Sequence, residues 1–111
     1  MNQDDRDSLP LTPAVFHILL SLAAGPRHGY AIMKEVGEQT DGELRLGPGK
    51  LYYSIQRMLE HGLIEEIALE NTANKRRPYR ITAVGRRLAS AEARRLQRSL
   101  RLAHARQLLE D

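Results

Sequence analysis

The stretch that decides the fold is GPGKLYYSIQRMLEHGLIEE, residues 47–66 of this 111-residue chain. Apolar residues recur in it with the i, i+4, i+7, i+8 spacing of one helix face, namely Leu51, Ile55, Met58 and Leu59. This spacing predicts a helix over residues 50–61, which Gly62 ends. The run LIEEIAL, residues 63–69, then predicts a strand.

The other face of this helix is polar and basic. At about 100° per residue, the side chains that cluster opposite the apolar face are Lys50, Tyr53 and Arg57, with Ser54 beside them. Arginine can pair with guanine through two hydrogen bonds, and lysine and hydroxyl groups can hold phosphates. The face therefore suits the major groove of DNA, although an ordinary solvated helix has the same pattern. Tyr52 lies at the edge of the core face, and we expect its ring to close the core and its hydroxyl to face DNA.

Two more helices are predicted before this one. Thr12-Pro13 is typical of a helix start, and the apolar run after it ends at the Gly-Pro pair of residues 25–26. The second helix is expected over residues 28–36. Arg27 and Tyr30 flank its start and are candidate phosphate contacts; the alternative is a helix cap with the tyrosine packed beneath it.

After the strand, a polar turn and the run PYRIT, residues 78–82, predict a returning strand. The two strands form a hairpin whose tip carries Lys75, Arg76 and Arg77. Such a tip can be a solvated loop, but next to a DNA-reading helix it is the place where phosphate contacts are expected.

Thr82 is expected to cap a last helix that runs to about Leu109. It carries an apolar stripe with steps of four and three, made of Ala89, Ala93, Leu96, Leu100 and Ala103, which Leu88 widens. A helix of roughly 27 residues spans about 40 Å, more than a domain this small can cover. The stripe therefore predicts contact with another chain.

Composition narrows the function classes. Net charge is +3, but residues 75–106 hold 11 Lys/Arg against one acid, Glu92. This asymmetry favours a polyanionic partner, although arginine-rich helices can simply be soluble. The chain has no cysteine, which excludes disulfides and cysteine-based zinc sites. The four histidines show no metal-ligand spacing, and no nucleophile motif is present, so we expect neither a cofactor nor an enzyme.

The start of the chain, MNQDDRDSLP, has no signal-peptide pattern, and the longest apolar stretch is too short to span a bilayer. We therefore expect a soluble, cytoplasmic protein that does not enter membranes. The order helix, helix, helix, hairpin, helix predicts a mainly α fold with a small two-stranded β-wing, a winged helix-turn-helix. Its expected parts are an N-terminal tail (1–10), a DNA-binding domain (11–82) and a C-terminal dimerisation helix (83–111).

Several motifs in this order resemble the PadR family of transcriptional regulators. They are His28-Gly29-Tyr30, Gly49-Lys50-Leu51-Tyr52, Gly62-Leu63-Ile64 and the Tyr79, Thr82, Gly85 exit from the wing. The resemblance covers about residues 10–105. The chain departs from the family at Lys50, where a small residue is common, and at Tyr53, where many members have proline. Both positions lie on the proposed DNA face, so no operator sequence can be transferred.

The resemblance implies a homodimer that binds operator DNA and represses transcription, often until a small-molecule effector releases it. The dimer would be held by the last helix packing partly against the partner's first helix, which adds Phe16, Leu19 and Leu20 to the interface. Any effector would then bind in the groove between these helices. Most of the arginines of the last helix are expected to form its solvated face. The alternative function is a winged-helix protein-interaction module without DNA binding, which would not need the basic wing or the Lys50 and Arg57 face.

Overall fold

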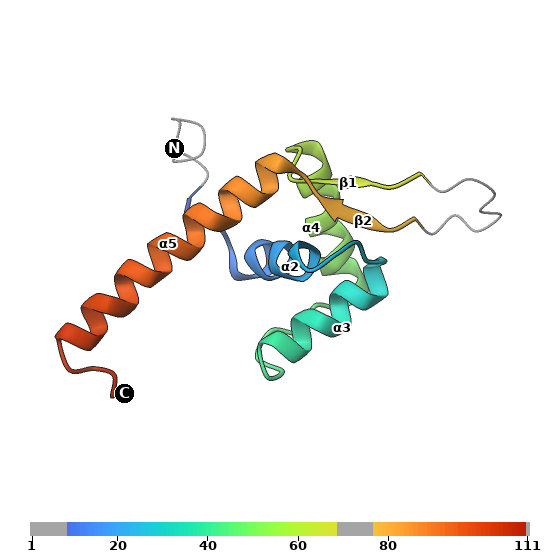
Figure 1. Ribbon diagram of the computed structural model, residues 1–111. Coiled ribbons are helices and arrows are strands. Elements are labelled where there is room, and N and C mark those ends of the chain that lie inside the picture. Colours follow the sequence, from blue (N-terminus) through green and yellow to red (C-terminus); the bar gives the residue numbers. More distant parts are fainter. Residues whose placement is uncertain (1–8, 69–76, 111) are drawn as a thin grey trace.

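The computed structural model describes residues 9–68 and 77–110 and confirms a mainly α winged helix-turn-helix with a small antiparallel sheet (Figure 1). The elements in chain order are α2 (Pro13–Ala23), α3 (Gly29–Gln39), α4 (Pro48–Glu60), β1 (Ile64–Glu66), β2 (Tyr79–Ile81) and α5 (Ala83–Ala105). The bounds differ from the expected ones by a few residues. The largest difference early in the chain is the end of α3, which was expected at Val36.

The helix boundaries follow from capping chemistry. The Thr12 side chain accepts a hydrogen bond from the Val15 N–H, and Pro13 occupies the first turn of α2. At the end of α4, Gly62 has a φ of 72°, and the Leu63 N–H binds the Met58 carbonyl at 2.9 Å. This left-handed turn satisfies carbonyls that the helix leaves unpaired, and glycine adopts it without strain.

The sheet pairs β1 with β2 in antiparallel register, with Ile64 opposite Ile81 and Glu66 opposite Tyr79. A third segment joins it at Arg27, whose backbone exchanges two hydrogen bonds with Tyr79 at 2.8 and 3.1 Å. The turn between α2 and α3 is therefore tied to the wing, a link that was not predicted. Residues 69–76, which include the predicted contacts Lys75 and Arg76, lie outside the described residues.

One hydrophobic core joins the helices to the base of the wing. α2 lies at its centre and packs against α3, α4, α5 and β2. Every element except β2 contributes buried apolar residues to this core, and the connecting segments add Leu46 and Leu63. The buried residues of the core are Ile18, Leu19, Leu22, Ile32, Val36, Leu46, Leu51, Ile55, Met58, Leu63, Ile64 and Leu88. The core thus fixes the apolar face of α4 and turns its other face to solvent.

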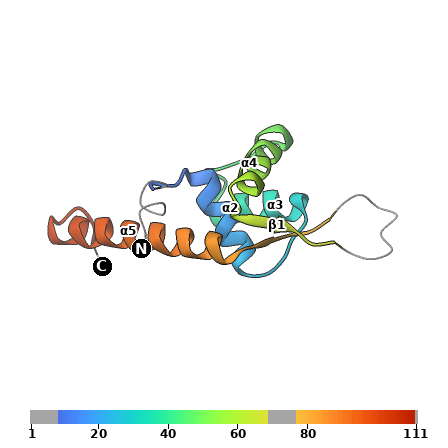
Figure 2. The ribbon, with the colours of Figure 1, turned by 90° about the horizontal axis from the view of Figure 1, so that it is seen from above.

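α5 leaves this core in the direction opposite to the hairpin, as the two views show (Figures 1 and 2). Its first half is packed on α2 and β2, and its second half is exposed. The helix ends at Ala105, not near Leu109 as expected. The cause is Gln107, which takes a φ of 62°, so that the Leu108 N–H turns back to the Ala103 carbonyl at 2.9 Å.

Glu92 lies in the middle of α5 and is 2% exposed. Its carboxylate accepts hydrogen bonds from the Arg95 guanidinium, the shortest at 2.6 Å, and from the Leu11 backbone N–H at 3.1 Å. The Arg95 hydrogen bond is the main reason that the pKa of Glu92 lies below its ordinary value, although burial acts in the opposite direction.

This depressed pKa predicts a loss of stability in acid. A carboxylate with a lowered folded-state pKa stabilises the fold above its unfolded-state pKa, and the contribution disappears as the pH falls through the folded-state pKa. We expect the difference in unfolding free energy between the wild type and Glu92→Gln to be constant near neutral pH and to shrink below about pH 4.5. Urea unfolding of both proteins across this range measures it. A difference that persists unchanged into acid would contradict the assignment.

Candidate nucleic-acid interface

The two faces of α4 are as different as the sequence predicts. Leu51, Ile55 and Met58 are buried in the core. Lys50, Tyr53 and Arg57 are exposed on the other side, and Ser54 beside them is half-buried. A helix anchored along its whole apolar face presents its outer side chains rigidly, which is what insertion into a groove requires.

Arg57 and Tyr53 lie one helical turn apart and interact with each other. The Arg57 guanidinium carbon lies 6.0 Å from the centre of the Tyr53 ring, which is 63% exposed. This is the outer limit of a cation–π contact, so the pair orients Arg57 weakly and leaves its donors free for a ligand.

Gln56 was not among the predicted contacts of α4, which were basic residues, tyrosines and Ser54. It is exposed on α4 next to Arg57, and its amide donates to the Glu60 carboxylate at 3.5 Å. An amide can bind adenine in the major groove with two hydrogen bonds. The sequence could have indicated Gln56, because its position on the helix, like those of Tyr53 and Arg57, points away from the apolar face.

Tyr52 corrects one expectation. Its ring does not close the core, because half of its surface is exposed (50%). The hydroxyl instead lies over Gly29 at the start of α3, where an added Cβ would come within 2.5 Å of it. The lack of a side chain at Gly29 is what lets the α4 tyrosine rest on α3. Tyr30, the next residue of α3, is 69% exposed.

Tyr79 was predicted as part of the returning strand and of the motif at the exit from the wing, but not as a site residue. Burial, then the Glu66 carboxylate and then Tyr52, raise the pKa of its phenol, so Tyr79 stays neutral over the physiological range. α4 itself packs against β1, the partner strand of β2 in the wing.

Arg27 is engaged within the chain. Its Nε lies 2.9 Å from the Glu35 carboxylate and donates to the Ser21 carbonyl at 3.1 Å. Its side chain is 29% exposed. The guanidinium therefore holds the turn between α2 and α3, and Arg27 is not part of the DNA interface proposed below.

The described part of the wing carries both positive and negative side chains, which pair with each other. Arg80 pairs with Glu65 across the two strands at 2.6 Å. Arg77, at the end nearer the tip, is exposed and lies 4.0 Å from Glu66, which is the longest distance that counts as an ion pair. Of the two arginines in the described part of the wing, Arg77 has the longer ion pair and Arg80 the shorter one.

Arg86 and Arg95 of α5 depart from the solvated face that was predicted for most arginines of this helix. Arg95 binds Glu92, and Arg86 donates to the Ala23 carbonyl at 3.5 Å. The partner of Arg86 lies in α2 and could not be found from the periodicity of α5, whereas Glu92 and Arg95 have the i, i+3 spacing of a helical ion pair in the sequence itself. Arg94, Arg98 and Arg101 are exposed.

The residues predicted for dimerisation separate into two groups. Leu19 and Leu88 are 0% and 4% exposed and belong to the chain's own core. Those exposed or half-buried are Phe16, Leu20, Ala89, Ala93, Leu96, Leu100 and Ala103. Leu96 and Leu100 are 42% and 51% exposed in the single chain. Only the second group is accessible to a partner chain.

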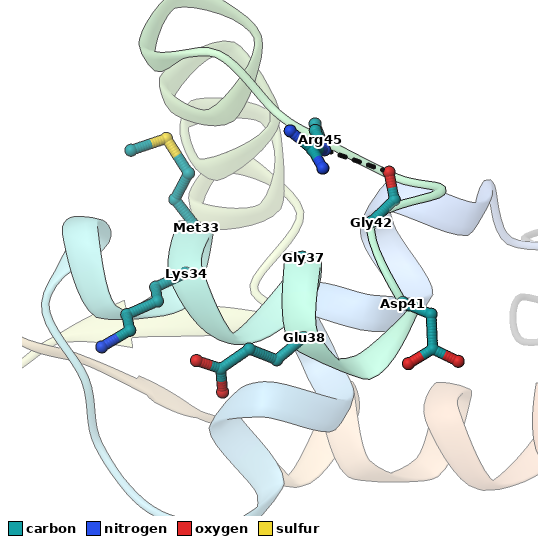
Figure 3. A pocket seen from close by; sticks show the side chains of 7 residues that line it. All are labelled: Met33, Lys34, Gly37, Glu38, Asp41, Gly42 and Arg45. Carbon is teal, nitrogen blue, oxygen red and sulfur yellow. Dashed lines mark hydrogen bonds between the residues drawn. The ribbon is translucent and has the colours of Figure 1, made fainter.

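A shallow depression lies beside α3 (Figure 3). Its lining combines both signs of charge and consists of Met33, Lys34, Gly37, Glu38, Asp41, Gly42 and Arg45. Arg45 is held by a hydrogen bond to the Gly42 carbonyl at 3.2 Å. This depression is not at the predicted effector groove, which was expected between the last helix and the first-helix residues Phe16, Leu19 and Leu20.

Residues 9–68 and 77–110 contain no helix that is both long and apolar enough to cross a membrane. Over the same ranges, no group of three or more His, Cys, Asp or Glu side chains is placed to hold a metal ion.

Comparison with known proteins identifies the family. Residues 18–91 match the transcriptional regulator PadR-like family. An uncharacterized 37.1 kDa protein in a transposon of Streptomyces fradiae is 38% identical over 81 residues. The match covers 73% of this chain but only 22% of that protein.

Solved structures share the fold. A transcriptional regulator from Clostridium thermocellum superposes with a TM-score of 0.68 at 24% identity, covering 95% of this chain and 96% of that one. A PadR family regulator from Clostridium difficile gives 0.71 at 23% identity, covering 85% and 97%. Bacillus subtilis PadR in complex with operator DNA gives 0.64 at 19% identity, covering 74% and 47%. The members of this family are transcriptional regulators and not enzymes. This chain belongs to the PadR-like family of transcriptional regulators.

Proposed function

We propose that this regulator binds duplex DNA sequence-specifically through α4 and the wing. One observation carries the proposal: Lys50, Tyr53 and Arg57 project from a helix whose opposite face is locked into the core. Neutral and cationic donors on a rigid helix are what base edges and phosphates require. The operator complex of Bacillus subtilis PadR supports this use of the shared fold.

The proposed active form is a homodimer. Leu96 and Leu100 are large apolar side chains exposed on the unsupported half of α5, and a second copy of the helix would bury them. The chain then divides into a DNA-binding part, residues 11–82, and a dimerisation helix, residues 83–111. A two-fold symmetric dimer binds two equivalent half-sites, so the operator should be palindromic. We further propose repression as the output, with release by a small molecule bound near the dimer helices.

Selection of bound duplexes from a random library tests the central claim. We expect an enriched palindromic sequence that competes for the protein better than an unrelated duplex of the same length. Mapping of bound DNA across the genome would then give the regulated genes. Failure to enrich any sequence, together with no binding to random DNA, would favour the protein-interaction module.

Arg57 should read bases, and Arg77 should hold the backbone. Because guanine presents two acceptors to a guanidinium, Arg57→Ala should cost about 1–3 kcal/mol on the selected operator and relax the preference at one base pair. Phosphates are the same in every sequence, so Arg77→Ala should weaken operator and random DNA alike and lower the salt slope by about one.

Fluorescence anisotropy titrations at several salt concentrations separate these effects. The matched control is Arg106→Ala, which removes the same charge from the exposed end of α5. Equal weakening of operator and random DNA by Arg57→Ala would show that Arg57 is a phosphate contact. An effect of Arg106→Ala as large as that of Arg77→Ala would show that only the net charge matters.

A further inference from the structure

Glu92 forms a three-way contact that neither dimerisation nor DNA binding explains. Its Oε2 accepts from Arg95 Nη2 at 2.6 Å, and its Oε1 accepts from Arg95 Nε and from the Leu11 N–H, both at 3.1 Å. Leu11 lies 81 residues earlier in the chain, in the segment that leads into α2. We call this set of contacts the latch.

The latch is geometrically demanding. A buried carboxylate is costly unless charge and hydrogen bonds compensate it, and here a guanidinium and a backbone donor do so. The Leu11 N–H is fixed by the start of α2 and is one of the two partners. Arg95 lies on α5 and holds the carboxylate in place, so the bond from the Leu11 N–H is the one that ties this part of α5 to the N-terminal segment, and it is kept only while α5 holds its position there.

The latch lies on α5 where the packed part of the helix ends and its exposed part begins. Up to Glu92 the helix is packed, with Leu88 and Ala91 buried. From residue 96 to residue 110 every described side chain is exposed, apart from the half-buried Ala103. The latch is thus the last extensive attachment of the helix to its own domain.

A small change of angle there has a large effect at the end of the helix. The distance along the axis from Glu92 to Ala105 is about 20 Å at 1.5 Å per residue. A tilt of about 10° would displace the end by about 3 Å, comparable to the rise of one base pair.

We propose that the latch is a positioning device: it sets the direction of α5 and thereby fixes the spacing between the two recognition helices of the dimer. This inference rests on the proposed function, in which α5 dimerises and α4 reads DNA. Without the latch, the fold and the dimer persist, but the two DNA-binding domains take a range of separations.

The direction of α5 can be measured without DNA. The chain has no native cysteine, so Gln56→Cys on α4 and Ser99→Cys on α5 give two unique spin-label sites. Labelled protein diluted into an excess of unlabelled wild type reports only the distance within one chain. We expect a narrow distance distribution in the parent protein and a clearly broader one with Glu92→Gln, with Arg95→Lys in between because lysine keeps the charge but loses the forked geometry.

Ile32→Val is the control for lost stability, since it removes a buried methylene from α3 and leaves the latch intact. We expect its distance distribution to match that of the parent. An unchanged width in Glu92→Gln overturns the inference, and so does equal broadening in Ile32→Val. Circular dichroism and thermal melting confirm that each variant is folded, and Arg95→Lys provides the milder variant should Glu92→Gln fail to fold.

The functional consequence is tested on selected operators whose half-sites are moved apart or together by one and two base pairs. The wild type should lose at least tenfold in affinity on each respaced duplex, whereas Glu92→Gln should lose only a few-fold. A spacing preference equally sharp in both proteins would overturn the functional half of the inference. Absence of DNA binding by the wild type would instead refute the proposed function, while the distance distributions still decide whether the latch directs α5.

Discussion

Replacing Gly85 with alanine should destabilise the fold by about 3 kcal/mol, the upper part of the range for overpacking a core. Gly85 is buried in the first turn of α5. An added Cβ would overlap the backbone carbonyl oxygen of Leu63 and lie 2.9 Å from Cγ1 of Ile81. A backbone oxygen cannot rotate away as a flexible side chain can, so either α5 or the base of the wing must move.

Urea unfolding followed by circular dichroism measures this effect. Gly37→Ala is the matched control, because it adds the same methyl group to the interior of α3, where nothing lies within 4 Å. Alanine has the better helix propensity, so Gly37→Ala should stabilise the chain by up to about 1 kcal/mol. If both variants moved stability in the same direction by similar amounts, close packing at Gly85 would not be the reason for glycine there.

The combined change of Leu96 and Leu100 to aspartate should convert the proposed dimer into a folded monomer. Each leucine that is fully buried at an interface contributes about 1.5–3 kcal/mol, and a symmetric dimer contains each of them twice. Aspartates there would also bury charge without partners. In the single chain both positions are already exposed, so the domain itself should lose little stability.

Multi-angle light scattering gives the mass, and circular dichroism confirms the fold. The control carries Ser90→Asp and Gln97→Asp, which add the same charge to the same helix at exposed polar positions outside the apolar stripe. The control should remain dimeric. An unchanged dimer in the Leu96 and Leu100 variant would place the interface elsewhere on the chain.

The sequence was sufficient for features that depend on local chemistry or on periodicity. Thr12 and Gly62 act within one helical turn, so their residue types alone predict where α2 begins and α4 ends. The outer face of α4 follows from the spacing of its apolar residues, because the side of a helix opposite its buried face must be exposed to solvent. For the same reason Lys50 and Arg57 were predicted to be exposed and are exposed.

Features that depend on residues far apart in the chain were not predictable. The bond between Glu92 and Leu11 spans 81 residues and leaves no periodic signal. The Arg27 side chain was expected at phosphates because it is cationic, but its partner Glu35 can be identified only once α2 and α3 are placed. The contact of Tyr52 with Gly29 has the same origin.

The end of α5 was missed for a different reason. Helix terminators are usually recognised by glycine, whereas here Gln107 adopts the left-handed conformation. Nothing in its residue type marks it, and the leucines that follow continue the apolar pattern past the true end.

The projecting half of α5 affects how the protein behaves in solution. The chain has a radius of gyration of 15.6 Å and extents of 56 × 33 × 22 Å. A compact chain of this length would have a radius of gyration of about 13 Å. An isolated chain would therefore have a high frictional ratio and would elute early from a gel-filtration column, at the apparent mass of a larger globular protein. Elution volume alone would mistake a monomer for an assembly, whereas dimers that pack their helices together would deviate less from a globular standard.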